Sequence, residues 1–227
     1  MKIPILFEDN HLLVVEKPVN IPVQEDSSGD NDLLTMLKKD IKIRYQKPGN
    51  VFLGLVHRLD RPVGGVIVFA KTSKAASRLA DGMRKKNFDR GYLAIVRGVP
   101  KKKKEMLEHY LFKDTKRNKV HAVSANHKNA KKAVLEYETI ASTEDLSLLA
   151  VRLHTGRSHQ IRVQLAASGL PFYGDQKYGQ HVNRPGQQIA LWAHTLAFPH
   201  PTTQELEEFK SNPPTEYPWN LFANYNQ

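Results

Sequence analysis

The feature that most restricts the fold of this chain is the shortness of its apolar runs. Each run has the length of a strand and is bounded by polar or turn-forming residues, a pattern typical of sheet rather than of long buried helices. The expected strands are Ile3–Phe7, Leu12–Val15, Val51–Leu59, Val66–Ala70, Tyr92–Val96, Lys119–Val123, Ala133–Ile140, Leu146–His154 and Ile189–Phe198. The sequence therefore predicts a chain dominated by strands.

A few helices are expected beside this sheet, each behind a residue whose side chain can cap a helix N-terminus. They are a helix capped by Asn31 or Asp32 that ends near Tyr45, a helix capped by Ser73, and a helix from Gly156 to about Ser168, capped by Thr155 and followed by Gly169. Together these elements predict an α+β fold with a mixed, mostly antiparallel central sheet and flanking helices.

The length of the chain sets the expected domain count. With 227 residues, 40% of them hydrophobic, the chain can bury one sizeable core. No internal repeat or long linker divides it, so we expect one domain over 1–227. Acidic residues interrupt the apolar N-terminus, and three prolines interrupt the long uncharged stretch Pro185–Gln204. We therefore expect no signal peptide, no membrane span and a cytoplasmic location.

The absence of cysteine restricts the possible chemistry. It excludes a disulfide scaffold, thiolate zinc sites, iron–sulfur clusters and cysteine nucleophiles. Any reactive group must be an oxygen or nitrogen group.

The positive charge of the chain is concentrated in one region. The formal net charge is +11, and the segment from Arg84 to Lys132 alone holds sixteen Lys or Arg residues against four acids. The run Lys101–Lys104 is interpreted as a solvated surface. The wider segment also contains Tyr92, His109, Tyr110 and Phe112, a combination that favours a polyanionic partner, RNA or DNA, with stacking groups beside phosphate contacts.

Two polar clusters could carry chemistry. The first, Gly54–Pro62, has an acid, an imidazole and two guanidinium groups beside a turn, although Asp60 could simply cap the turn before Pro62. The second, His154–Arg162, is expected on the first two turns of a helix, where backbone N–H groups favour an anion. A solvated helix face is the alternative for this second cluster.

Several motifs in one order resemble the RluA family of pseudouridine synthases over nearly the whole chain. They are Val15-Glu16-Lys17-Pro18, His57-Arg58-Leu59-Asp60 followed by Gly65–Thr72, Arg90–Gly98, Thr155–Arg162, Tyr173-Gly174-Asp175 with Tyr178-Gly179, and Leu191–His194 with Phe198–Pro201. The resemblance implies the pseudouridine synthase catalytic fold and isomerisation of specific uridines in ribosomal or transfer RNA. It also implies a catalytic domain without the small N-terminal RNA-binding module of the S4 type that some relatives carry.

The resemblance also assigns roles to individual residues. It makes Asp60 the catalytic carboxylate, Tyr92 the aromatic group against the target uracil and Arg162 the partner of Asp60. The implied RNA-binding residues are Arg58, which fills the place of the evicted base, with Arg61, Arg90 and Arg157. The chain departs from the family pattern at Gly64, Arg90 and Gln164, where serine, lysine and histidine are common.

The implied reaction suits these residue types. Conversion of uridine to pseudouridine exchanges no electrons, so no cofactor and no metal are expected. It needs an ionised carboxylate near the sugar. Burial with a base would favour the neutral acid unless a cation opposes it, and the permanently charged Arg162 suits that task. Tyr92 offers a stacking face, although an ordinary sheet aromatic is its alternative.

Two other functions remain as alternatives. A metal-dependent hydrolase could combine Asp60 with His57, His154, His159 or His194, but these residues form no dense metal-ligand motif. A non-catalytic RNA-binding module is the second alternative, and the combined presence of Asp60, Tyr92 and Arg162 argues against it. RNA is the only expected partner, and no obligate protein partner is evident.

Overall fold

The computed structural model describes residues 2–225, which form two compact units. Within the described residues, unit 1 comprises 2–90 and 193–211, and unit 2 comprises 91–192 and 212–225. The boundaries fall inside two strands, β5 (Asp89–Arg97) and β10 (Leu191–Pro199). The expectation of one domain over 1–227 stays a prediction.

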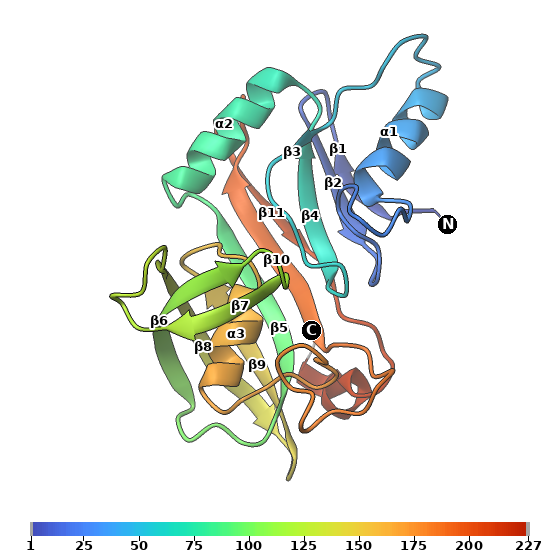
Figure 1. The fold of residues 1–227 in the computed structure, drawn as a ribbon. Coiled ribbons are helices and arrows are strands. Elements are labelled where there is room, and N and C mark those ends of the chain that lie inside the picture. Colours follow the sequence, from blue (N-terminus) through green and yellow to red (C-terminus); the bar gives the residue numbers. More distant parts are fainter. Residues whose placement is uncertain (1, 226–227) are drawn as a thin grey trace. The chain divides into compact units, whose positions relative to one another are not determined.

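Unit 1 is built on the strand order β1-β2-β4-β10, with β11 beside β10 and β3 beside β4 (Figure 1). The further strands are β1 (Ile5–Glu8), β2 (Leu12–Lys17), β3 (Gly54–Leu55), β4 (Gly64–Ala70) and β11 (Leu206–Lys210). The helices are α1 (Leu33–Arg44) and α2 (Ser73–Arg84), and α2 contacts β3 and β4. The pairings β1–β2, β2–β4, β3–β4 and β10–β11 are all antiparallel.

The central strand of unit 1, β4, is buried along its whole length. Its second residue, Gly65, has φ +114°, and a Cβ at this position would lie 2.2 Å from the carbonyl oxygen of Ala193. Only glycine allows this close approach of two backbones. The glycine thus fixes the start of the strand that directly follows the loop containing Asp60.

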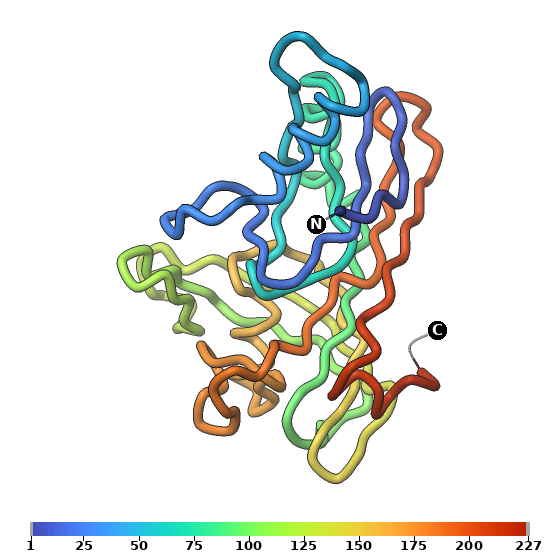
Figure 2. The backbone as a smooth tube through the Cα atoms, turned by 90° about the vertical axis from the view of Figure 1, so that its right-hand side faces the viewer, coloured from blue at the N-terminus to red at the C-terminus, as the bar shows by residue number. Residues whose placement is uncertain are grey.

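Unit 2 has the strand order β5-β9-β8-β6-β7. Its other strands are β6 (Lys104–Asp114), β7 (Lys119–Val123), β8 (Lys131–Ser142) and β9 (Leu146–Leu153), with helix α3 (Gln160–Ala167) and the 3-10 segment η1 (Trp219–Tyr225). Helix α3 packs on β6 and β7 through Val163, which joins Leu111, Val120 and Ala133 in an apolar cluster. Figure 2 follows the β6–β7 hairpin and the loop after it as a yellow-green tube.

The predicted fold class is confirmed, since the sheet is mostly antiparallel and flanked by a few helices. Helix α1 begins where predicted, because the Asp32 carboxylate accepts a hydrogen bond from the Thr35 N–H at 3.0 Å. The predicted glycine after α3 is also present, with Gly169 at φ +79°. Among residues 2–225 no helix combines the length and the apolar character that a membrane span requires.

Three predicted boundaries are wrong. The strand expected over Val51–Leu59 is reduced to the two residues of β3. Helix α2 is capped by Thr72 rather than Ser73, because the extended Thr72 places its hydroxyl 3.1 Å from the Ala75 N–H. Helix α3 begins at Gln160 instead of Gly156, because His159 takes the left-handed conformation with φ +51° and separates the preceding turn from the helix.

Two strands were not predicted from the sequence. Strand β6 carries charged side chains along much of its length, and this pattern predicts a basic surface instead of a strand. Strand β11 lies in the acidic C-terminal region and has no fully buried residue. Both strands exist because a neighbour supplies the ladder: β6 pairs with β7 and β8, and β11 pairs with β10.

Candidate active site

Asp60 lies in the loop between β3 and β4 of unit 1, as predicted. Its backbone carbonyl accepts a hydrogen bond from the Val63 N–H at 2.9 Å, which closes a turn around Pro62. Asp60 is half-buried, whereas Leu59 and Val63 on either side are buried. The two buried apolar neighbours anchor the turn, while Asp60 itself stays partly exposed.

A buried ammonium group supports this turn. The Lys17 side chain is fully buried, and its Nζ donates to the carbonyl oxygens of Pro18 at 2.8 Å, Ile21 at 2.6 Å and Arg61 at 3.0 Å. Burial lowers the pKa of Lys17 to about 7, and the Asp60 charge opposes that shift. Lys17 therefore ties the end of β2 to the residue that follows Asp60. Its structural role was not predicted from the sequence.

The predicted RNA-binding arginines of unit 1 have different surroundings. Arg58 is exposed in the loop beside Asp60. Arg61 is also exposed, and its guanidinium forms an ion pair with Asp30 and a hydrogen bond to Ser28 Oγ at 3.0 Å. Arg90 is half-buried, and its Nε has no hydrogen-bond partner within the described part of the chain. Only Arg58 and Arg61 present their side chains openly to solvent.

Arg162 lies on α3 of unit 2 with its side chain 8% exposed. Its Nε and Nη2 each donate at 2.8 Å to one oxygen of Asp175, and the side chain of Asp175 is 1% exposed. The guanidinium also lies 5.2 Å from the ring centroid of Tyr178. Asp175 and Tyr178 belong to one of the motifs that resemble the family, but the sequence alone does not identify either as a partner of Arg162.

The two other predicted residues of unit 2 lie on strand β5 and before helix α3. Tyr92 is buried on β5 and pairs in register with Val151 of β9. Arg157 lies in the turn before α3, not on the helix, and its Nε donates to the Lys132 carbonyl oxygen at 3.1 Å. The Gln160 side chain accepts from the Arg157 N–H at 2.9 Å. Because α3 begins only at Gln160, Arg157 lies before the first helical turn, where the sequence predicts an anion site.

The predicted site residues therefore divide between the units. Unit 1 brings Arg58, Asp60 and Arg61 together in one loop, and unit 2 contains Tyr92, Arg157 and Arg162. The pairing of Asp60 with Arg162 stays a prediction, as do the catalytic roles of Asp60, Tyr92 and Arg162.

The histidines considered for a metal site have other contacts. His57 Nε2 accepts from the Val68 N–H at 3.3 Å, and burial, with the Arg90 charge adding to it, lowers the pKa of His57 to about 3. His194 Nδ1 lies 2.8 Å from the Ser211 carbonyl oxygen, and His159 Nδ1 lies 2.7 Å from the Tyr178 hydroxyl. In residues 2–225 no three His, Asp or Glu side chains are grouped closely enough to hold a metal ion.

Comparison with known proteins identifies the family. The family model described as RNA pseudouridylate synthase matches residues 11–167. The chain belongs to the RNA pseudouridylate synthase family. The pseudouridine synthase match includes Asp60, Tyr92 and Arg162, and it ends before Asp175 and Tyr178. Membership makes the chain an isomerase that acts on RNA, as the resemblance implied.

Curated pseudouridine synthases are similar over most of the chain. An RNA pseudouridine synthase of Bacillus subtilis, described as uncharacterized, is 37% identical over 208 residues, which cover 90% of this chain and 67% of that protein. The ribosomal large subunit pseudouridine synthase D of Zymomonas mobilis is 33% identical, with 93% and 69% covered. The protein of the same name from Haemophilus influenzae is 31% identical, with 94% and 68% covered.

Solved structures of pseudouridine synthases share the fold. Human RNA pseudouridylate synthase domain containing 4 superposes with a TM-score of 0.78 at 24% identity, covering 93% of this chain and 88% of that chain. Human RNA pseudouridylate synthase domain containing 1 gives a TM-score of 0.73 at 22% identity, with 96% and 86% covered. At these identities the likeness supports the α+β architecture.

Proposed function

We propose that this pseudouridine synthase isomerises uridines in large-subunit ribosomal RNA, that it acts in the cytoplasm, and that Asp60 is its catalytic carboxylate. The observation that carries the proposal is that Asp60 is half-buried on a turn that the buried Lys17 ammonium stabilises, by donating a hydrogen bond to the carbonyl oxygen of Arg61. A carboxylate on an anchored turn next to two exposed arginines suits an attack on a nucleotide within a polyanion.

The reaction is a rearrangement with no net change in oxidation state. The N1–C1′ bond of uridine breaks, the uracil turns within the site, C5 bonds to C1′ and the C5 proton is lost while N1 gains one. Asp60 would attack C1′, remove a proton from the sugar or support positive charge at C1′ as the bond breaks. Each of these roles requires the ionised form.

Two groups of unit 2 would complete the chemistry. Arg162 would oppose the cost of burying the Asp60 carboxylate against a base, since guanidinium stays charged at physiological pH. Tyr92 would supply a flat face for the detached uracil. Its hydroxyl is a reluctant base, because a phenol has a pKa of about 10, so stacking is the role we assign to it.

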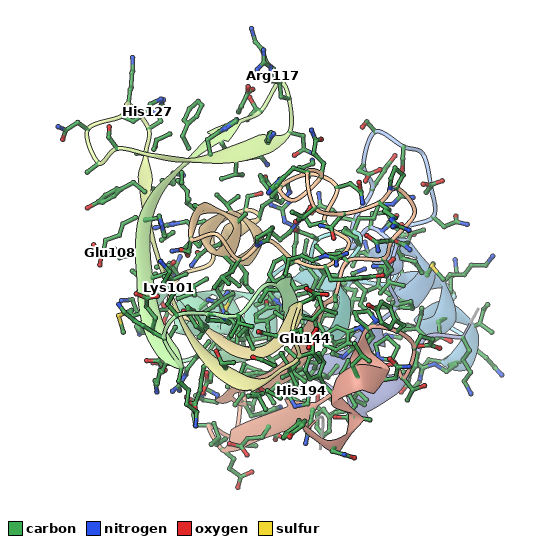
Figure 3. The ribbon with its side chains drawn as sticks, turned by 90° about the horizontal axis from the view of Figure 1, so that it is seen from below. Lys101, Glu108, Arg117, His127, Glu144 and His194 are labelled. Atoms are coloured by element: carbon green, nitrogen blue, oxygen red, sulfur yellow. The ribbon has the colours of Figure 1, made fainter. Side chains whose placement is uncertain are left out.

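The RNA would be held by the basic surface of unit 2. The β6–β7 turn exposes Lys116 and Arg117, and the following loop exposes His127 and Lys128. Figure 3 shows Arg117 and His127 at the same end of this part of the molecule. Such side chains bind phosphates and contribute salt-sensitive affinity without reading sequence.

The target nucleotide has to leave its stack before C1′ and C5 can be reached. Arg58 suits the task of filling the vacated position, because it is exposed and lies two residues from Asp60. The choice of ribosomal over transfer RNA follows the names of the Zymomonas mobilis and Haemophilus influenzae relatives.

Pseudouridine mapping tests the proposal. Total RNA from cells lacking the protein is compared with RNA from cells complemented by the wild type, by Asp60→Asn or by Asp145→Asn, an exposed control in the β8–β9 turn. We expect sites in large-subunit ribosomal RNA to be lost, and to return with the wild type and the control only. Restoration by Asp60→Asn would remove the role of the carboxylate. RNA binding without any lost site would favour a non-catalytic module, and lost sites confined to transfer RNA would correct the substrate.

A further inference from the structure

A connected set of polar contacts in unit 2 surrounds Arg162. It involves the turn 175–178, helix α3 and the β6–β7 hairpin, and its members are Asp175, Lys177, Tyr178, His159, Val120 and Asn118. Asp175 and Tyr178, the two members that touch the guanidinium, lie beyond the residues that the family model matches.

Asp175 fixes one edge of the guanidinium and folds its own turn. Its Oδ1 accepts from Arg162 Nη2 and from the backbone N–H groups of Lys177 at 2.9 Å and Tyr178 at 3.2 Å. Burial alone would raise the pKa of Asp175, but the hydrogen bonds and charge of Arg162 hold it below its ordinary value. The ionised carboxylate thus determines where both Arg162 and the Tyr178 backbone lie.

Gly174 allows this turn to form. It has φ +79°, and a Cβ there would lie 2.2 Å from the Gln188 carbonyl oxygen. No other residue fits without moving that backbone. The chain therefore enters the turn at one fixed position directly before Asp175.

Tyr178 connects the guanidinium to the hairpin. Its ring packs against Leu111, Val120, Ala133 and Val163 and lies beside the Arg162 guanidinium. Its hydroxyl accepts from the Val120 N–H at 2.9 Å and lies 2.7 Å from His159 Nδ1. Strand β7 is the last strand in the sheet order of this unit. The Tyr178 hydroxyl therefore accepts a hydrogen bond from a backbone N–H of an edge strand.

A second contact holds the tip of the same hairpin. Lys177 Nζ donates to the Asn118 carbonyl oxygen at 2.9 Å, in the turn that presents Lys116 and Arg117. The turn 175–178, which orients Arg162, therefore contacts the β6–β7 hairpin at two places, at strand β7 and at the turn that joins the two strands. The hydroxyl contact is the specific one, because a phenylalanine would fill the same apolar space.

We propose that Asp175 and Tyr178 are positioning residues. They fix the orientation of the Arg162 guanidinium relative to the β6–β7 hairpin, so that RNA bound to the hairpin meets a correctly oriented arginine. The inference rests on the proposed function, in which Arg162 takes part in turnover. Asp175 acts through its two hydrogen bonds with the guanidinium. Tyr178 acts because its ring lies beside the guanidinium while its hydroxyl accepts the Val120 N–H.

The experiment uses the whole chain and an RNA transcript that spans a mapped target uridine. The uridines of the transcript are labelled with tritium at C5. If mapping yields no site, large-subunit ribosomal RNA labelled in the same way is the substrate. Tyr178→Phe removes only the hydroxyl. Its matched control, Tyr137→Phe, removes another buried hydroxyl of unit 2, which donates to Glu105 at 3.2 Å. Single-turnover tritium release, RNA affinity and melting temperature are measured for both variants and for Asp175→Asn.

We expect Tyr178→Phe to lose about tenfold in single-turnover rate, since a small misplacement of a reacting group has a large kinetic cost. Its RNA affinity should stay within about twofold, because the phosphate contacts on the hairpin are unchanged. Asp175→Asn should lose more, and Tyr137→Phe should match the wild type. A structural role alone would lower the melting temperature and leave the rate of the folded enzyme unchanged.

Two activity-independent measurements separate this inference from the proposed function. Amide hydrogen exchange at Val120 should accelerate in Tyr178→Phe, and the Arg162 Nε–H resonance should shift in Asp175→Asn. If both spectroscopic changes occur while the wild type forms no pseudouridine, the proposed function fails, but the structural link between Arg162, Asp175, Tyr178 and Val120 is supported. A Tyr178→Phe rate within twofold of wild type, or a loss confined to RNA affinity, overturns the inference.

Discussion

The two units each bury one cation beside the residues of the proposed site, and the charge of that cation is compensated by different means. In unit 1 the buried Lys17 ammonium that fastens the Asp60 turn is surrounded by three carbonyl oxygens. In unit 2 the buried Arg162 is matched by the full opposite charge of Asp175. Dipoles compensate a buried charge only in part, whereas a bidentate carboxylate compensates it directly. The difference predicts how each region responds to mutation and to pH.

The largest effect is expected from Arg162→Met. Turnover should be lost, and the free energy of unfolding should fall by about 3–5 kcal/mol, because the substitution leaves Asp175 as an uncompensated buried charge. Urea unfolding at pH 7 and single-turnover tritium release measure the two effects.

The double variant Arg162→Met with Asp175→Asn is the control for that interpretation. It removes the uncompensated charge, so stability should partly return while turnover stays absent. Equal stability of the single and double variants would contradict the charge-pair account of unit 2.

A smaller loss at pH 7, about 2–3 kcal/mol, is expected from Lys17→Met, because three carbonyl oxygens lose a donor but no charge remains buried. Lys39→Met, at an exposed position on α1, is the matched control. If Lys17→Met destabilised the chain more than Arg162→Met, the contrast between the two regions would be reversed.

The Lys17 comparison also has a pH dependence with a definite sign. Burial lowers the pKa of Lys17 from 10.5 to about 7, so between these values the unfolded chain binds more protons at this site than the folded chain. The Lys17 contribution to stability therefore rises with pH through this window and is constant below it. The stability difference between wild type and Lys17→Met should grow from pH 7 to pH 10. A difference that shrinks over this range would contradict the burial of the ammonium.

The smallest effect concerns the exposed hairpin of unit 2. Lys116→Ala with Arg117→Ala should make the slope of log affinity against log salt shallower by about 0.7–0.9 for each RNA phosphate that these side chains neutralise. Lys39→Ala with Lys42→Ala removes the same charge from α1 of unit 1 and should leave the slope unchanged. Equal slopes for the two double variants would show that net charge, and not the hairpin, attracts the RNA.

The sequence was most informative where structure is determined locally. Helix α1 was predicted because the Asp32 cap and the apolar spacing are contiguous in the chain. Helix α3 was extended too far because its true start depends on a left-handed His159 and on the Gln160 side chain, neither of which has a pattern in the sequence. Strand β6 was missed because its ladder partners, not its own residues, determine it.

The site shows the same division. Motif order was enough to identify the family, which the family match confirms. The roles that the same motifs assign to Asp60, Tyr92 and Arg162 stay predictions. The Asp175 contact joins residues thirteen positions apart across a glycine turn, and it becomes visible only in the folded chain. Lys17 is likewise a charged residue that only the structure shows to be fully buried.

The most direct test of the account is product formation by purified Asp60→Asn. RNA from cells that lack the protein is incubated with wild type or variant, and pseudouridine is quantified at the mapped positions. The account predicts conversion by the wild type and none by Asp60→Asn, with RNA affinity and melting temperature unchanged. Conversion by Asp60→Asn at a rate close to that of the wild type would contradict it.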